Sequence, residues 1–298
     1  MHENAVESRV RSAGVELAVR ELPAAGATVV LVHGFPDNSS VWDPLARLLH
    51  DHHGLHVVTY DVRGAGASTA PADREGYRTE RLVDDLVAVL DSLNPAAPPA
   101  REPAPVHLVG HDWGSVQLWD AVTTSGSDPR LQGRLATFTS ISGPSLDHVA
   151  RFARSRDLRS RLPQAIRSWY VAAFQVPVLP ELAFRTLAGP LSSLIAQAQG
   201  SRQPHWGASF GDDAAHGVEL YRANVPRRMR APGSGRTDVP VLTVVPTRDS
   251  FLVPALFDDV ASYAPNGRRV DVDAGHWVVS QQPELVADLV VEWIREHA

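Results

Sequence analysis

Short apolar runs, rich in β-branched residues, alternate along most of the chain with stretches whose apolar residues recur at helical spacing. The apolar runs predict strands, since β-branched side chains pack well on a pleated surface. The predicted strands are Val15–Val19, placed at an edge of the sheet, Ala27–Val32, Leu55–Tyr60, Val106–Val109, Ala136–Ser142, Val239–Val245 and Arg269–Val272.

Helices are predicted between these strands. Arg81–Leu93 carries apolar residues at a period near 3.6, and Pro44 stands at the first position of another helix, where its missing N–H costs nothing. Further helices are predicted at Val116–Val122, Pro254–Tyr263 and Pro283–His297. Strands that alternate with helices predict a mostly parallel sheet covered on both faces, which is an α/β fold.

The alternation stops between residues 145 and 230. This segment is rich in Arg, Pro, Leu and Ala, and it predicts helices around Leu146–Phe152, Pro163–Phe174 and Pro190–Gln199. We therefore predict an α/β core made of residues 1–144 and 231–298, and an inserted all-helical cap made of residues 145–230. The cap is expected to cover the carboxyl ends of the strands, where ligands of such sheets bind.

Composition narrows the classes of function. The 28 basic and 34 acidic residues give a formal net charge of −6, which gives no indication of a nucleic-acid partner. The chain has no cysteine, so disulfides, thiolate metal sites and a cysteine nucleophile are excluded. We expect a cytoplasmic protein, because charged residues interrupt the first twenty positions and leave no apolar segment typical of a signal peptide or membrane span.

The strongest chemical motif is Gly110-His111-Asp112-Trp113-Gly114, which directly follows the strand Val106–Val109. Small residues on both sides of a central residue resemble a nucleophile elbow, with Asp112 where serine is usual. A carboxylate is already ionised near neutral pH and attacks without a base, but the resulting ester needs an activated water for its hydrolysis. The alternative is an Asp112 that only caps the following helix.

Two further residues follow later strands at the same edge of the sheet. Asp249 comes after Val239–Val245, and His276 comes after Arg269–Val272. Asp112, Asp249 and His276 therefore appear in the order nucleophile, acid, histidine, as in α/β-hydrolases. The backbone N–H groups of Phe35 and Trp113 are predicted to form an oxyanion hole, because Pro36 has no N–H and Gly34 permits close approach.

Metal and cofactor sites are not expected. The cluster His50-Asp51-His52-His53 fits no closed zinc pattern and is interpreted as a solvated surface turn. Gly64-Ala65-Gly66 lacks the third glycine of a dinucleotide fingerprint. Arginines cluster in the early cap, which indicates a solvated helical face or a basic patch for anionic substrates or membrane surfaces, so peripheral lipid contact stays open. The clustered residues are Arg151, Arg154, Arg156, Arg159, Arg161 and Arg167.

Over nearly its whole length the chain resembles epoxide hydrolases of the α/β-hydrolase fold. The stretches that carry the resemblance are HGFPD (33–37), DVRGAGAS (61–68), GHDWG (110–114), the Asp249 loop and GHW (275–277). In that family two cap tyrosines bind and protonate the epoxide oxygen, and the resemblance of WYVAAFQ (169–175) and LYRAN (220–224) to their motifs implies this role for Tyr170 and Tyr221. Ser115, where the family often has a third glycine, is a departure expected to affect packing.

The resemblance implies an epoxide hydrolase that needs no cofactor and converts a small apolar epoxide to a vicinal diol. Apolar side chains near Tyr170 in the sequence predict an apolar, lipid-like substrate. The residues expected to contact it are Phe35, Trp113, Phe174, Val176 and Trp277. The chain is most similar to the hydrolase half of actinobacterial fusions of an epoxide hydrolase with a short-chain dehydrogenase, so a whole protein and one domain of a fusion both stay open, as does the oligomeric state.

Two other functions use the same residues. A haloalkane dehalogenase has the same carboxylate nucleophile and histidine, but such enzymes often have Asn where this chain has Phe35. A ligand-binding module without catalysis is the second alternative, and the complete set of catalytic candidates argues against it. Tests of diol formation, halide release and binding without turnover distinguish the three.

Overall fold

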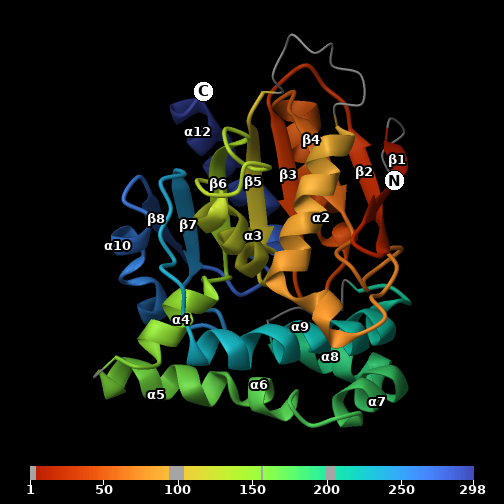
Figure 1. Cartoon of the computed structure of the whole chain (residues 1–298), viewed down its shortest axis with the longest axis vertical. Coiled ribbons are helices and arrows are strands. Elements are labelled where there is room, and N and C mark those ends of the chain that lie inside the picture. Colours follow the sequence, from red (N-terminus) through yellow and green to blue (C-terminus); the bar gives the residue numbers. More distant parts are fainter. Residues whose placement is uncertain (1–4, 94–103, 156, 199–205) are drawn as a thin grey trace.

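The computed structural model describes residues 5–93, 104–155, 157–198 and 206–298, and its strands form one twisted sheet (Figure 1). The strand order is β1-β2-β4-β3-β5-β6-β7-β8. β2 pairs antiparallel with β1 and β4, and the remaining neighbours are parallel. The strands are β1 (Val6–Ser12), β2 (Val15–Leu22), β3 (Thr28–Val32), β4 (His56–Tyr60), β5 (Val106–His111), β6 (Leu135–Ile141), β7 (Val241–Pro246) and β8 (Arg268–Val272).

The parallel part of the sheet confirms the predicted α/β fold, but the placement of Val15–Val19 at the edge is wrong. These residues belong to β2, which lies between β1 and β4. The strand at that edge is β1, whose first four residues are exposed. Its sequence, VESRVRS, alternates charged and apolar residues without an apolar run, because only part of one face is buried there.

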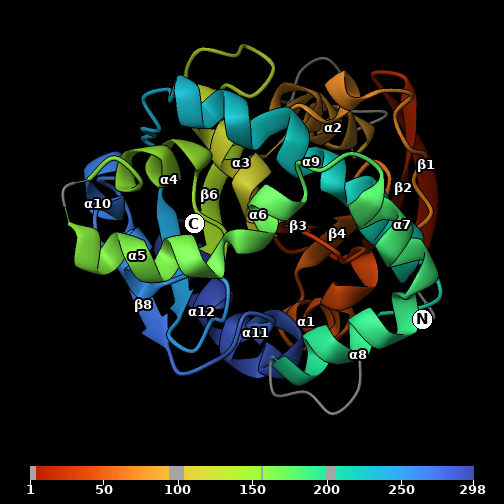
Figure 2. The same cartoon turned by 90° about the horizontal axis from the view of Figure 1, so that it is seen from below.

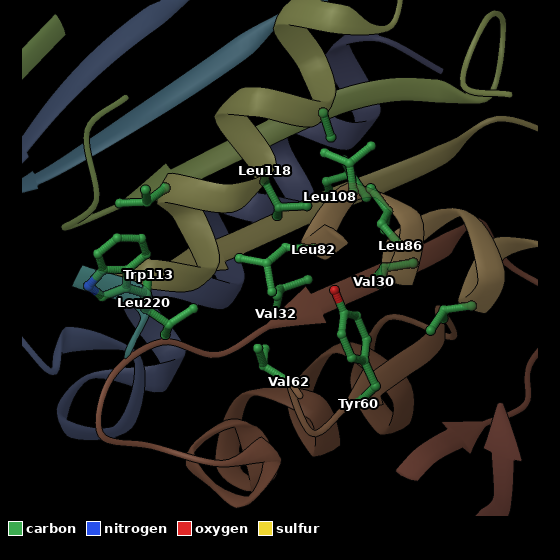
Figure 3. Packing of buried hydrophobic residues seen from close by; sticks show 14 of the residues in the cluster. Val30, Val32, Tyr60, Val62, Leu82, Leu86, Leu108, Trp113, Leu118 and Leu220 are labelled. Atoms are coloured by element: carbon green, nitrogen blue, oxygen red, sulfur yellow. The ribbon is translucent and has the colours of Figure 1, made fainter. Parts of the chain in front are cut away.

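Helices cover both faces of the sheet, as predicted from the alternating pattern. On one face, α2 and α3 pack their leucines against Val30, Val32 and Leu108 (Figure 3). On the other, α1 and α12 cover Val29 and Leu31, because successive side chains of a strand point to opposite faces. The helices of the core are α1 (Asp43–Arg47), α2 (Thr79–Ser92), α3 (Trp113–Thr124), α10 (Val260–Tyr263), α11 (Val278–Gln281) and α12 (Pro283–Glu296), with short 3₁₀ or π turns η1 (Ser39–Trp42), η2 (Leu48–His52), η3 (Arg74–Tyr77) and η4 (Pro254–Phe257).

A helical insertion between β6 and β7 lies across the carboxyl ends of the parallel strands and forms the predicted cap (Figures 1 and 2). Two of its helices, α7 and α9, were not predicted. α9 mixes charged and apolar residues and contains Pro226, so its sequence shows no simple helical stripe. The cap helices are α4 (Leu146–Phe152), α5 (Leu158–Arg167), α6 (Trp169–Ala173), α7 (Leu179–Thr186), α8 (Ala188–Ala198) and α9 (Phe210–Arg230).

Polar contacts join α9 to the core. The Arg228 guanidinium lies 2.5 Å from the Asp120 carboxylate on the core helix α3, and it also lies 2.7 Å from that of Asp147 on the cap helix α4. The buried Asn224 side chain accepts a hydrogen bond of 2.9 Å from the Thr79 backbone N–H at the start of α2. These contacts fix α9 over the ends of the strands. Among the described helices, none combines the length and apolar character needed to cross a bilayer.

Candidate active site

The chain turns sharply between β5 and α3, and Asp112 occupies the turn with φ of +52° and ψ of −124°. Few residues with a side chain adopt such a conformation, which stores strain at this position. A Cβ atom on Gly114 would lie 1.9 Å from the Val32 carbonyl oxygen, and one on Gly110 would lie 2.7 Å from the Ser115 Cα atom. Both flanking glycines are therefore required by close backbone packing.

The Asp112 side chain points toward the loop after β3. Its Oδ1 atom accepts a hydrogen bond of 2.7 Å from the backbone N–H of Phe35. A Cβ atom on Gly34 would lie 2.5 Å from both Asp112 Oδ1 and the Trp113 backbone nitrogen. Both atoms therefore lie close to Gly34. The Phe35 and Trp113 N–H groups predicted as an oxyanion hole thus come from loops that meet around one oxygen of Asp112.

His276 lies between two carboxylates. Its Nδ1 atom is 2.7 Å from Asp249 Oδ2, and its Nε2 atom is 3.5 Å from Asp112 Oδ2. Burial acts to lower the pKa of His276, but the negative charges of Asp249 and Asp112 outweigh it and raise the pKa to about 10. Burial acts to raise the pKa of Asp249, but His276 and two backbone N–H donors hold it below its usual value. The three predicted side chains are therefore brought together.

The loop that carries Asp249 is held by the cap as well as by its own backbone. Asp249 Oδ1 accepts hydrogen bonds from the backbone N–H groups of Phe251 and Leu252, at 2.7 and 3.1 Å. From α5, Gln164 donates to the Phe251 carbonyl and Arg167 donates to the Asp249 carbonyl. Gln164 was not predicted, and Arg167 was interpreted as part of a solvated face or basic patch, because no motif indicates which residues of the cap reach the core.

A cavity of about 540 Å³ lies above Asp112, between the sheet and the cap. Asp112, Trp113, Tyr170 and Tyr221 all line it, although they come from widely separated parts of the chain. Most of the other lining side chains are apolar, and they include Leu146, Val149, Phe152, Val171, Val225 and Met229. The nucleophile candidate and both cap tyrosines therefore face one largely apolar space.

The two tyrosines pack edge to face, with ring centroids 5.8 Å apart. Tyr221 also contacts Trp113, at 4.8 Å between centroids. Burial and the nearby Asp112 charge raise the pKa of the Tyr170 phenol above its usual value. Burial and the charges around it also raise the pKa of Tyr221. Both phenols consequently stay protonated at neutral pH, so each can donate a proton.

The structure places the other predicted substrate contacts differently. Among them, only Trp113 lines the cavity. Phe35 and Phe174 pack against Tyr221, at 5.3 and 5.1 Å between ring centroids, and do not line the cavity. Val176 is 46% exposed on the outside of the cap, and Trp277 is buried with its indole N–H donating to Asp37. Substrate contact by these four residues gains no support from their positions.

Buried polar residues around the site support the loops. His33 donates from Nδ1 to the Gly34 carbonyl and accepts at Nε2 from the Val62 N–H, which joins the loops after β3 and β4. Beneath His276, His111 donates from Nε2 to the His276 carbonyl oxygen. Burial lowers the pKa of His111 to about 4, so it stays neutral. These histidines lie within the motifs quoted above, but only their contacts indicate a supporting role.

The histidine cluster at residues 50–53 is interpreted from the contacts of His50. His50 contacts the Asp51 carboxylate and the Pro23 carbonyl oxygen at the surface. Within the ranges that the structure describes, no three His, Cys, Asp or Glu side chains are arranged to hold a metal ion.

Comparison with known proteins shows the family. Residues 27–283 match the family model described as alpha/beta hydrolase fold. The chain is 34% identical over 293 residues to "Probable oxidoreductase EphD" of Mycobacterium tuberculosis, an alignment that covers 93% of this chain and 47% of that protein. The chain thus spans about half the length of that relative.

Two further relatives are named as epoxide hydrolases. Epoxide hydrolase A of Mycobacterium tuberculosis is 29% identical over 331 aligned positions, with 97% of each chain covered. The crystal structure of the Bacillus megaterium epoxide hydrolase in complex with an inhibitor superposes with a TM-score of 0.76 at 20% identity, covering 97% of this chain and 100% of that one. At that identity the superposition shows the fold alone. The chain therefore belongs to the alpha/beta hydrolase fold family and is related to epoxide hydrolases.

Proposed function

We propose that this protein hydrolyses an apolar epoxide to a vicinal diol through a covalent ester of Asp112. The observation that carries the proposal is that two phenols, Tyr170 and Tyr221, line the same cavity as the Asp112 carboxylate. When an epoxide opens, its oxygen stays on the substrate as an alkoxide, which needs a proton. A departing halide has no such need, so the paired phenols favour an epoxide over a haloalkane.

In the first step Asp112 Oδ2 attacks a ring carbon of the epoxide from the side opposite the breaking C–O bond. The other oxygen, Oδ1, is held by the Phe35 N–H and becomes the carbonyl oxygen of the ester. The electron pair of the broken C–O bond goes to the ring oxygen, which takes a proton from Tyr170 or Tyr221. The product of this step is a hydroxyalkyl ester of Asp112.

The second step uses His276 as a base. Esterification removes the negative charge of Asp112, which is one cause of the raised pKa of His276. The pKa of His276 therefore falls once the ester has formed, so Nε2 gives up its proton and the phenolate left by the first step takes one up. Nε2 can then accept a proton from water. Asp249 remains hydrogen bonded to Nδ1, where it orients the ring and stabilises the imidazolium.

The hydroxide that His276 generates attacks the carbonyl carbon of the Asp112 ester. Negative charge then develops on Oδ1, toward which the Phe35 N–H already points. The Trp113 N–H is the second proposed donor. Collapse of the tetrahedral intermediate breaks the bond between the carboxyl carbon and Oδ2, and Oδ2 takes the proton from His276 and leaves as a hydroxyl group of the diol. The carboxyl group of Asp112 now holds the oxygen of the water, and its proton passes to His276, so Asp112 is restored as a carboxylate and no cofactor is consumed.

The cavity supports an apolar substrate, since burial of apolar surface contributes about 25 cal/mol per Å². The test is turnover of terminal, aromatic and fatty-acid epoxides beside matched haloalkanes, with diol and halide measured in parallel. Diol formation that disappears in Asp112→Asn supports the proposal. Halide release without diol indicates a dehalogenase, and binding without either product indicates a ligand-binding module.

A further inference from the structure

Helix α5 is held to the core by polar contacts. Gln164 donates to the Phe251 carbonyl at 2.9 Å, and its side-chain oxygen accepts from the Val253 N–H at 2.9 Å. Arg167 donates to the backbone carbonyls of Asp249 and Leu252, at 2.7 and 2.8 Å. In this helix the inward face is thus polar, which is the reverse of the usual arrangement for a helix on a protein surface.

The outward face of α5 and the start of α6 is apolar. Leu158, Leu162, Ile166 and Trp169 are between 63% and 70% exposed. Their spacing of four, four and three residues places them on one side of the helix. Figure 1 shows α5, α6 and α7 as the layer farthest from the sheet, and Figure 2 looks onto this layer. We call the four residues the outer cap face. Soluble proteins rarely expose such a contiguous apolar patch without a partner.

Positive charges flank the outer cap face. At 100° per residue, Arg159 and Arg161 fall on opposite sides of the apolar row. Among the described residues, neither lies within ion-pair distance of a carboxylate, and Arg161 donates to the Ser155 carbonyl at 2.7 Å. The acidic residue nearest in sequence, Asp157, caps the helix by accepting from the Arg159 and Ser160 N–H groups. The apolar row is therefore bordered by uncompensated guanidinium groups.

We propose that the outer cap face docks on an anionic lipid bilayer, with its leucines, isoleucine and tryptophan entering the interface. An apolar row that contains tryptophan and is flanked by arginines has the chemistry of a helix that lies in a bilayer surface. The arginines are attracted by anionic headgroups. A second copy of the chain fits less well, because a symmetric contact would bring the same arginines against each other.

Docking through the outer cap face would affect how substrate reaches the cavity. Leu158 and Leu162 also line the cavity above Asp112, so its opening lies at the outer cap face. A protein docked in this way would take up an apolar substrate directly from the bilayer, so the substrate would not have to cross water. This consequence rests on the proposed function, whereas docking itself does not.

The test is co-sedimentation of the protein with vesicles of phosphatidylcholine alone and with about one third phosphatidylglycerol. We expect the parent protein to sediment with the anionic vesicles and the double variant Ile166→Ser/Trp169→Ser to bind them at least about tenfold more weakly. Both replaced side chains are mostly exposed, so the core is left intact, and the double variant keeps its rate with a water-soluble epoxide. Val6→Ser, which replaces a half-exposed apolar residue of β1, is the matched control and should bind as the parent does.

Charge is tested by Arg159→Glu, with Arg295→Glu on α12 as a control of equal charge change. We expect only Arg159→Glu to weaken binding to the anionic vesicles. The proposal is overturned if the parent stays in the supernatant with both kinds of vesicle. It is also overturned if neutral vesicles bind equally well and Arg159→Glu has no effect, or if the parent is a dimer in solution that Ile166→Ser/Trp169→Ser converts to monomers. Because sedimentation needs no turnover, failure here is distinct from failure to form diol.

Discussion

His276 Nε2 lies 3.5 Å from Asp112 Oδ2, so the imidazole is next to the very carboxylate whose ester it is proposed to hydrolyse. While Asp112 is charged, this proximity helps to raise the pKa of His276 to about 10, although burial opposes the shift. Once Asp112 is esterified, that contribution disappears. The two half-reactions are thus coupled, because formation of the Asp112 ester prepares His276 to act as the base in its hydrolysis.

The first prediction separates these half-reactions. His276→Gln, mixed with an epoxide substrate, is expected to accumulate a covalent adduct, because Asp112 attacks without a base but water does not. Intact-mass spectrometry should show one substrate mass added, and digestion should place it on the peptide that contains Asp112. The double variant Asp112→Asn/His276→Gln should show no adduct. A folded His276→Gln protein that turns over normally would contradict the mechanism.

The second prediction concerns the charge of Asp112. Asp112→Asn keeps the shape of the side chain, and it should lower diol formation by more than about 10³-fold. The same change should lower the pKa of His276, because one of the two nearby carboxylates is lost. Titration of the His276 ring signals by NMR measures this directly. An unchanged pKa would mean that Asp249 alone sets the charge of His276.

The third prediction is a dependence of stability on pH. The pKa of His276 in the folded protein, about 10, lies above its ordinary value of 6.5. Its contribution to the free energy of unfolding is therefore fully present below pH 6.5 and is lost as the pH rises toward 10. Each pKa unit corresponds to about 1.4 kcal/mol, so the loss should reach several kcal/mol.

Urea unfolding of the parent and of His276→Gln at a series of pH values between these limits isolates this contribution. Titrating groups that do not contact His276 are common to both proteins, so their effects cancel in the difference. The parent should lose stability relative to the variant as the pH rises. Parallel curves would show that His276 is neutral in the folded state.

The fourth prediction tests the two phenols. Tyr170→Phe and Tyr221→Phe should each slow the formation of the Asp112 ester, because each removes a proton donor worth about 10²–10⁴-fold as a general acid. One phenol partly covers for the other, so the double variant should lose more than either single one. Rapid quench followed by mass spectrometry measures ester formation. If the double variant forms the ester at the parent's rate, both tyrosines serve only in packing.

The fifth prediction concerns Gly34. A Cβ atom there would lie 2.5 Å from Asp112 Oδ1 and from the Trp113 backbone nitrogen. Gly34→Ala should therefore displace the nucleophile and its donors, lowering the rate of ester formation by about 10²-fold and stability by about 1–3 kcal/mol. Gly126→Ala is the control, because a Cβ atom there meets nothing within 4 Å. Equal behaviour of the two variants would show that the loop after β3 moves freely.

The positions of Asp112, Asp249 and His276 at the carboxyl ends of strands could be predicted from the sequence alone. Asp112 and Asp249 follow the apolar runs Val106–Val109 and Val239–Val245, which predict buried strands of a parallel sheet. His276 follows β8, a partly exposed strand at the edge of the sheet. Gly110 and Gly114 also predicted the sharp turn at Asp112, since only a very tight turn requires two glycines so close together. Local patterns of this kind predict the structure of neighbouring residues. They are enough to place a side chain when the strand, turn and helix around it are consecutive in the chain.

What only the tertiary structure decided is how distant segments meet. The sequence does not contain the distance of 3.5 Å between His276 and Asp112, or the common cavity of Tyr170 and Tyr221, because these depend on how the cap packs on the core. The same packing turned α5 so that Gln164 and Arg167 face the core, whereas Ile166 faces outward. Periodicity shows that a helix has two faces, but the partner that each face finds is determined by contacts between residues far apart in the chain.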